Sequence, residues 1–227
     1  MTETWPATRG ALIEEQLRLG ALAPPPWKPP AAGVVAGAVF VCFGRGGSGP
    51  GQPGDNSWAS AATWRDGRVL ALAIARGVAP AGYTPGLLAL REGPSLEAAA
   101  RALPALPDVL LVDATGRDHP RRAGLALHLG AVLGVPTVGV THRPLVASGP
   151  SPGRRGDAMP LLLGSEVVGY LLRARTGTLP LAVHAAWRAT PDVAREVVLA
   201  TTRQHRTPEP LRAARQAARE FRGRTSH

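Results

Sequence analysis

The chain has 227 residues, 44% of them apolar and 19% charged, a balance that predicts a folded protein with a sizeable core. Arginine and lysine number 26 against 16 acidic residues, and the formal charge of +10 favours an anionic partner such as nucleic acid. An arginine-biased coding sequence would give the same excess. The single cysteine, Cys42, excludes an internal disulfide, and the longest apolar run, residues 31–43, is shorter than the ~20 residues that cross a bilayer. The amino terminus carries no signal-peptide pattern, so we expect a cytoplasmic protein without a membrane partner.

The first part of the chain predicts one helix followed by strands. Helical periodicity covers residues 8–22, and the proline-rich segment 24–30 ends it. Asp66-Gly67 is a strong hairpin signal between two apolar runs. We therefore expect three strands in antiparallel succession, over residues 34–43, 57–64 and 68–76.

Helices and strands alternate in the remainder. The expected helices are 95–103, with Pro94 in its first turn, 120–133, 190–203 and 209–222. The expected strands are 109–112, 136–140, 166–175 and 181–184. Residues 146–160 predict a flexible loop. The sequence thus predicts one α/β domain over residues 1–227, in which a mixed sheet is flanked by helices. Residues 1–30 would form its helical and proline-rich lead-in, and residues 208–227 a basic helix and tail.

Two carboxylates are placed where ligands bind. Asp113 directly follows the apolar run 109–112, and α/β sheets place ligands at the carboxyl ends of their strands. A turn-forming aspartate is the alternative. Glu92 precedes an expected helix start, where a carboxylate also serves as a partner for the helix dipole.

Basic and aromatic residues add candidates for an anion site. His119, Arg121 and Arg122 stand at an expected helix start, which suits a phosphate but is also an ordinary surface feature. Tyr83 lies on a Pro-Gly turn, where it would either enter a base stack or cover the sheet. Four arginines share one face of the last helix, as a rail for nucleic acid or as a solvated surface: Arg212, Arg215, Arg219 and Arg222.

Together these segments resemble the endonuclease V family. Residues 113–126, Asp-Ala-Thr-Gly-Arg-Asp-His-Pro-Arg-Arg-Ala-Gly-Leu-Ala, are similar to its Asp-Gly-x-Gly-x-x-His-Pro-Arg-Arg-x-Gly-x-Ala. Residues 83–92 resemble its Tyr-Ile-Pro-Gly-Phe-Leu-Ser-Phe-Arg-Glu. Residues 135–140 and 206–212 also match in the same order, so the resemblance covers about residues 8–215.

The resemblance implies an RNase H-like fold and an inosine-directed endonuclease of DNA repair. Such an enzyme uses Mg²⁺, or Mn²⁺, to cleave DNA or RNA on the 3′ side of a deaminated base. The resemblance assigns the metal ion to Glu92 and Asp113, and catalysis to His119 and to His142. It assigns binding of the substrate to Tyr83, Pro85, Gly86, Leu88, Gly116, Arg121 and Arg122.

Several departures fall on the metal site. The family's first-strand motif Val-Ala-Gly-x-Asp is Val-Ala-Gly-Ala-Val at residues 35–39, which puts Val39 where the family has a metal-binding aspartate. His142 stands where the family has a catalytic lysine, and a mostly neutral imidazole offsets less phosphate charge. Arg215 replaces an acidic residue. Asp118 and Asp55 are the candidate substitute ligands.

Two functions follow from these residues. The first is a working endonuclease with a rearranged metal site. The second is a catalytically degenerate relative that binds nucleic acid without cleaving it, because Val39 and His142 replace two residues of the family's site. Under both we expect a monomer that binds DNA or RNA.

Overall fold

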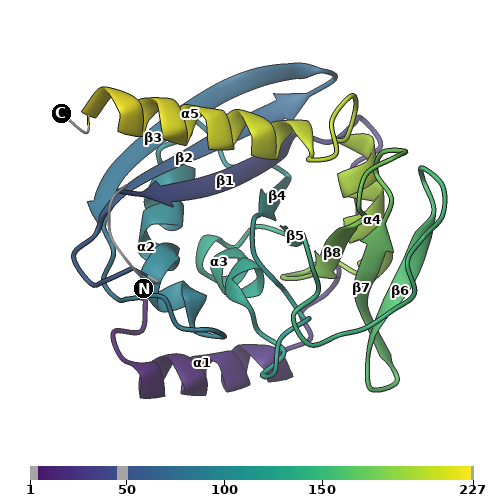
Figure 1. Cartoon of the computed structure of the whole chain (residues 1–227), viewed down its shortest axis with the longest axis horizontal. Coiled ribbons are helices and arrows are strands. Elements are labelled where there is room, and N and C mark those ends of the chain that lie inside the picture. The colour runs from purple at the N-terminus through teal and green to yellow at the C-terminus, as the bar shows by residue number, and fades with distance from the viewer. Residues whose placement is uncertain (1–4, 45–50, 226–227) are drawn as a thin grey trace.

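The computed structural model describes residues 5–44 and 51–225, which form one mixed sheet and the helices that cover it (Figure 1). The strands lie in the order β3-β2-β1-β4-β5-β8-β7-β6. The helices are α1 (Arg9–Ala21), α2 (Leu88–Arg101), α3 (Leu125–Leu133), α4 (Pro191–Ala200) and α5 (Glu209–Thr225). The strands are β1 (Ala36–Phe43), β2 (Asn56–Arg65), β3 (Arg68–Val78), β4 (Val109–Val112), β5 (Thr137–Thr141), β6 (Ala158–Leu163), β7 (Glu166–Leu172) and β8 (Leu181–Ala185).

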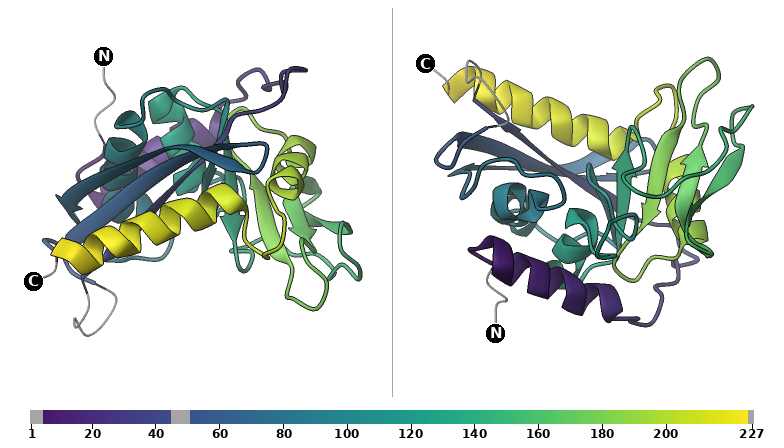
Figure 2. Two further views of the ribbon diagram at one scale, coloured as in Figure 1. Left: turned by 90° about the horizontal axis from the view of Figure 1, so that it is seen from above. Right: turned by 60° about the horizontal axis from the view of Figure 1, so that its bottom comes forward.

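Helices cover both faces of the sheet, as Figure 2 shows for α1 and α5 on opposite sides. Leu12 of α1, Leu96 of α2 and Leu127 of α3 belong to one buried apolar cluster. Val197 of α4 and Leu211 of α5 belong to a second cluster on the other face. The prediction of three antiparallel strands followed by alternating helices and strands is confirmed.

The pairing of β1 with β4 decides which side chains share a face. The two strands are parallel, and Val39 lies beside Val112. Both valines belong to the cluster under α1, α2 and α3. Because side chains alternate along a strand, Phe40, the next residue of β1, points to the opposite face. Phe40 accordingly packs against the cluster that α5 covers.

The predicted hairpin is confirmed. Asp66 and Gly67 adopt φ values of 51° and 89°, the left-handed conformation that a tight turn between twisted strands requires. The strands that it joins pair antiparallel over their whole length, with one irregularity at Trp64.

The expected start of α2 was wrong. The helix begins at Leu88 rather than near residue 95, so Pro94 lies inside it and Glu92 belongs to the helix instead of preceding it. Pro94 lacks the N–H that would reach the carbonyl of Leu90. The buried residues Ala89 and Leu96 hold the helix to the sheet on both sides of this missing bond.

Two further predictions needed correction. The helix expected over 120–133 begins at Leu125, because Arg122 has a left-handed φ of 62° and Gly124 is extended. The loop expected over 146–160 ends at β6, and Ser148 already bridges to Leu162. No helix in the described parts of the chain has the length and apolar character needed to cross a membrane.

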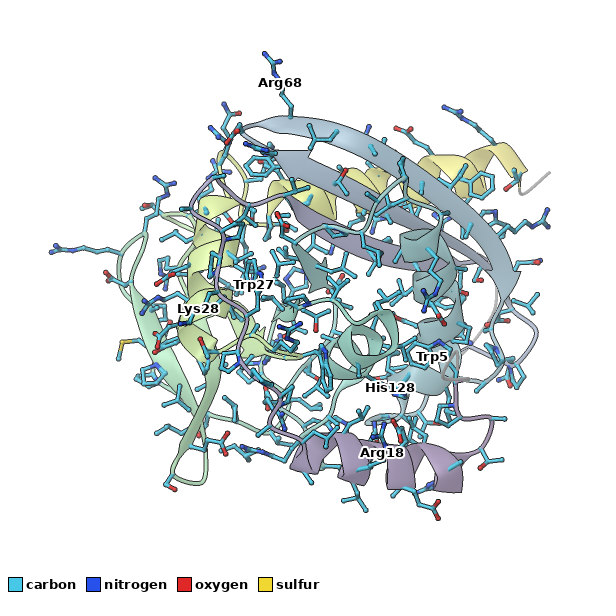
Figure 3. The ribbon with its side chains drawn as sticks, turned by 180° about the vertical axis from the view of Figure 1, so that it is seen from behind. Trp5, Arg18, Trp27, Lys28, Arg68 and His128 are labelled. Atoms are coloured by element: carbon cyan, nitrogen blue, oxygen red, sulfur yellow. The ribbon has the colours of Figure 1, made fainter. Side chains whose placement is uncertain are left out.

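Trp5, in the segment before α1, contacts both α2 and α3. The ring of Trp5 lies 4.4 Å from that of His128, and its Nε1 donates to Glu97 at 2.7 Å (Figure 3). Burial lowers the pKa of His128 to about 4, so the imidazole is neutral in this contact.

Candidate functional site

A cavity of about 230 Å³ lies at the carboxyl end of β4. Its wall is built by α1, the turn before α2, the segment after β4, the start of α3 and the segment after β5. The lining residues are Gln16, Tyr83, Gly86, Leu88, Asp113, Ala114, Thr115, His119, Gly124, Leu125, Thr141, Arg143, Pro144 and Leu145. The predicted site residues Tyr83, Gly86, Leu88, Asp113 and His119 are therefore brought together.

The turn formed by residues 83–86 is held through one backbone oxygen. The carbonyl of Gly86 accepts hydrogen bonds from Gln16 Nε2 at 3.0 Å, His119 Nε2 at 3.1 Å and Arg121 Nη2 at 2.9 Å. Gly86 itself has φ of 74°, a conformation that glycine adopts without strain. Tyr83 stays 46% exposed at the mouth of the cavity. The turn is thus rigid while its aromatic ring remains available.

His119 and Arg121 support this turn, whereas Arg122 has its partner elsewhere. The Nδ1 atom of His119 accepts from the backbone N–H of Arg121, and burial lowers the pKa of the imidazole. Arg121 also donates to Gln16 Oε1 at 2.6 Å, and Arg122 pairs with Glu166. The expectation that these residues stand at a helix start was wrong, since α3 begins later, at Leu125. That they bind a phosphate stays a prediction.

Pro85 and Gly116 are not among the cavity-lining residues. Pro85 is exposed on the turn. Gly116 packs so closely on β8 that an added Cβ would collide with the backbone of Ala185. Its role in the described fold is close packing rather than contact with the cavity.

The cavity-lining Asp113 acts electrostatically on a second carboxylate, that of the buried Glu92 in α2. Burial, and then the charge of Asp113, raise the pKa of Glu92 to about 8, although the Arg91 guanidinium lowers it. Asp113 is about one-third exposed, at 31%. Carboxylates placed this way are typical of functional sites.

Phe40 of β1 and Asp113 both approach the guanidinium of Arg215, whereas Val39 lies beside Val112 and faces the opposite core. Phe40 and Val39 are adjacent, and in a strand adjacent residues point to opposite faces. That Val39 stands where the family has its metal-binding aspartate stays a prediction.

Arg215 of α5 contacts Asp113 from the face of the sheet on which Phe40 lies. Its Nη2 lies 2.9 Å from Asp113 Oδ2, and its Cζ lies 5.2 Å from the centre of the Phe40 ring. Arg219 also approaches this ring, at 5.8 Å. The arginine face of α5 is thus turned partly onto β1, and Arg222 even donates to the carbonyl of Phe43.

The candidate substitute ligands are engaged elsewhere. Asp118 is fully buried, and its carboxylate accepts from the backbone N–H groups of Leu145, Val146 and Ala147. Asp55 pairs with Arg91 at 2.7 Å. Neither is free to bind a metal ion in this arrangement.

His142 lies in a cationic environment next to this site. It is exposed, and partial burial together with the charges of Arg206 and Arg215 lowers its pKa, against the opposing charge of Asp113. The imidazole is therefore held neutral.

These donors do not fit a divalent metal ion. Mg²⁺ and Mn²⁺ prefer several oxygen ligands, whereas Asp113 is paired with a guanidinium and its neighbour Phe40 is apolar. Within residues 5–44 and 51–225, no three side chains of histidine, cysteine, aspartate or glutamate gather closely enough to hold a metal ion.

Solved structures resemble this fold closely. The crystal structure of endonuclease V from Streptomyces avermitilis superposes with a TM-score of 0.85 at 36% identity, covering 98% of this chain and 96% of the other. The catalytic domain of human endonuclease V gives 0.82 at 27% identity, with 97% and 99% covered. Endonuclease V of Ciona intestinalis, in complex with a 24mer DNA containing an inosine, gives 0.78 at 19% identity, with 95% and 97% covered. The predicted RNase H-like fold is thereby confirmed.

Sequence comparison gives the family. The family model described as Endonuclease V matches residues 51–216. Endonuclease V of Streptomyces avermitilis is 38% identical over 216 residues, which cover 92% of this chain and 90% of the relative. That of Methanopyrus kandleri is 45% identical over 148 residues, 64% and 63% of the two chains. The chain belongs to the endonuclease V family, whose members are metal-dependent nucleases.

Sequence reasoning missed the residues that join distant segments. Gln16 and Arg143 line the cavity without belonging to any motif used above. The approach of Phe40 to Arg215 was also missed, because it depends on the register of β1 against the distant strand β4 and on the position of α5. Arg215 was noted as a departure, but its pairing with Asp113 spans 102 positions and has no local signal.

Proposed function

We propose that this protein recognises a deaminated base, inosine, in DNA or RNA by taking it into the cavity beside the 83–86 turn. The observation that carries the proposal is the Gly86 carbonyl with its three donors, which fixes the turn at the cavity mouth. Base-flipping proteins need such a rigid wedge, and Tyr83 supplies the exposed aromatic ring. The complex of the Ciona intestinalis relative with inosine-containing DNA supports this substrate.

The geometry supports recognition better than metal-dependent cleavage. The guanidinium of Arg215 on Asp113 and the apolar Phe40 beside it leave no oxygen cage for Mg²⁺ or Mn²⁺. In this proposal the protein binds damaged nucleic acid without cleaving it, and the cavity residues hold the base.

A second candidate function is the family's own reaction, cleavage 3′ to the deaminated base. It is favoured by Asp113 in the cavity wall and by Glu92, whose pKa the charge of Asp113 raises. A metal ion bound there would polarise the scissile phosphate and activate water.

The test combines binding and nicking on end-labelled strands. Matched strands with inosine or adenosine at one position are incubated with the protein in Mg²⁺, in Mn²⁺ and in EDTA. We expect at least ~10-fold preference for inosine, lost in Tyr83→Ala, and no nick. Equal binding of both strands would overturn recognition of the deaminated base. A metal-dependent nick that Asp113→Asn abolishes would establish the second candidate instead.

A further inference from the structure

The candidate site already contains a cation of its own. We infer that the Arg215 guanidinium takes the place of a divalent metal ion in this chain and binds a backbone phosphate of the nucleic acid. This inference rests on the proposed function for its ligand. It goes beyond that function by naming the charged group and by predicting binding without any metal ion.

The position of Arg215 is fixed from three sides. Asp113 accepts from its Nη2 at 2.9 Å, and the Phe40 ring lies 5.2 Å from its Cζ. The helix that carries it is anchored one residue earlier, where Ala214 is fully buried and its carbonyl accepts from the Ser60 hydroxyl. Guanidinium groups stack well on aromatic faces, so Phe40 is suited to a guanidinium and unsuited to a metal ion.

Arg215 has donors left over. Its Nε is buried and has no acceptor among the described residues, so an anion from solvent meets the Nη atoms, of which Nη2 alone donates to Asp113. A guanidinium offers five N–H groups in a planar fork that matches two oxygens of a phosphate. With 23% of its side chain exposed, Arg215 can meet such an anion from solvent while Asp113 keeps its orientation.

The surrounding charges favour an anion over a second cation. Arg219 shares the Phe40 ring, and Arg143 lines the adjoining cavity. Asp113 and Glu92 are the opposing carboxylates, and Asp113 is already paired with Arg215. A divalent ion placed on Asp113 would displace the guanidinium and face its positive charge at close range.

A metal titration without nucleic acid tests whether the cation of this site is the Arg215 guanidinium or a divalent metal ion. Calorimetric titration with Mn²⁺ is made on the wild type, on Phe40→Asp/Arg215→Asp and on the matched control Val39→Asp/Arg215→Asp. We expect at least ~10-fold tighter binding to the Phe40 variant than to the wild type or the control, because position 40 faces Asp113 and position 39 faces the opposite core. Tight binding of Mn²⁺ to the wild type, or equal gains in both double variants, would overturn the inference.

A second experiment tests whether Arg215 binds a backbone phosphate. It uses single variants only, so it does not require the double variants to fold. Fluorescence anisotropy measures the affinity of inosine and adenosine strands in EDTA for the wild type, for Arg215→Gln and for Arg101→Gln, which removes a charge on α2. We expect Arg215→Gln to weaken both strands about equally, by ~10-fold, and to reduce the salt slope by about 1. The Arg101→Gln control should change neither by more than ~2-fold.

The two proposals fail in different ways. Loss of wild-type binding in EDTA, or an Arg215→Gln affinity equal to that of Arg101→Gln, would contradict the guanidinium's role. Equal affinity for the inosine and adenosine strands, with the effect of Arg215→Gln retained, would contradict only the proposed recognition of the deaminated base and not the role of Arg215.

Discussion

The carboxyl end of β4 separates two regions of different construction. On the cavity side, Gln16, His119 and Arg121 converge on one carbonyl of the 83–86 turn. On the α5 side, Arg215 rests between Asp113 and Phe40 with donors unfilled. In the first region, all three donors share an acceptor within the chain, the Gly86 carbonyl. In the second region, the Arg215 guanidinium donates to Asp113 and still has N–H groups without an acceptor in the described part of the chain.

The turn is stabilised by neutral and charge-assisted hydrogen bonds in which neither Asp113 nor Arg215 takes part. The charged pair meets the cavity only through Asp113, which lines it. We therefore expect substitutions of Arg215 to leave the turn intact.

The largest effect is expected at Asp118, beneath the segment that closes the cavity. Asp118→Ala leaves the buried backbone N–H of Ala147 and two neighbouring N–H groups without their acceptor, so the free energy of unfolding should fall by about 3–5 kcal/mol. Urea unfolding followed by circular dichroism measures the loss. A stable variant with an unchanged midpoint would show that the segment is held by other contacts.

The two arginines should differ in stability. Arg121→Met breaks hydrogen bonds to Gly86 and Gln16 and should cost about 2 kcal/mol. Arg215→Met breaks a partly exposed ion pair with Asp113 and should cost at most about 1 kcal/mol. The same urea experiment compares them, and equal costs would remove the distinction between the two regions.

Glu92 should give stability a characteristic dependence on pH. Its folded pKa of about 8 is above the ordinary 4.5, so the folded state keeps a proton that the unfolded chain releases. The free energy of unfolding should therefore fall between those two pH values, relative to Glu92→Gln, by at least about 1 kcal/mol and by no more than the ~5 kcal/mol of the full shift, and then level off. Thermal unfolding of both proteins across this range makes the comparison, and parallel curves would refute it.

The smallest effect is expected where Arg122 pairs with Glu166. Glu166 is 63% exposed, and Glu166→Gln should change the free energy of unfolding by less than about 1 kcal/mol. It frees one guanidinium, so a rise of ~2-fold in the affinity for single strands is expected by anisotropy. A larger loss of stability would contradict this expectation and would show that the Arg122–Glu166 pair helps to hold the cavity wall in place.

Local signals predicted much of this molecule. The Asp66-Gly67 hairpin depends on adjacent residues, and it formed as expected. The motif residues Tyr83, Leu88 and Asp113 line one cavity because they stand at the ends of elements that meet there.

Long-range pairing decided what the sequence left open. Whether Val39 or Phe40 faces Asp113 depends on the register of β1 against a strand some 70 residues away. Arg215 meets Asp113 only because α5 crosses β1. The three donors on Gly86 likewise come from two distant segments, so no spacing rule would reveal them.

The hydrogen bond from Gln16 to Gly86 has a practical consequence. The 83–86 turn takes part of its support from α1, the first helix of the chain, 70 positions upstream. Trimming the protein to the stretch that matches the family model, residues 51–216, would discard this prop along with the β1 strand. Limited proteolysis between Gln16 and Ala21 would also remove this support, although the 83–86 turn itself stays covalently intact. On a gel such a product would differ from the whole chain only by a small loss of length.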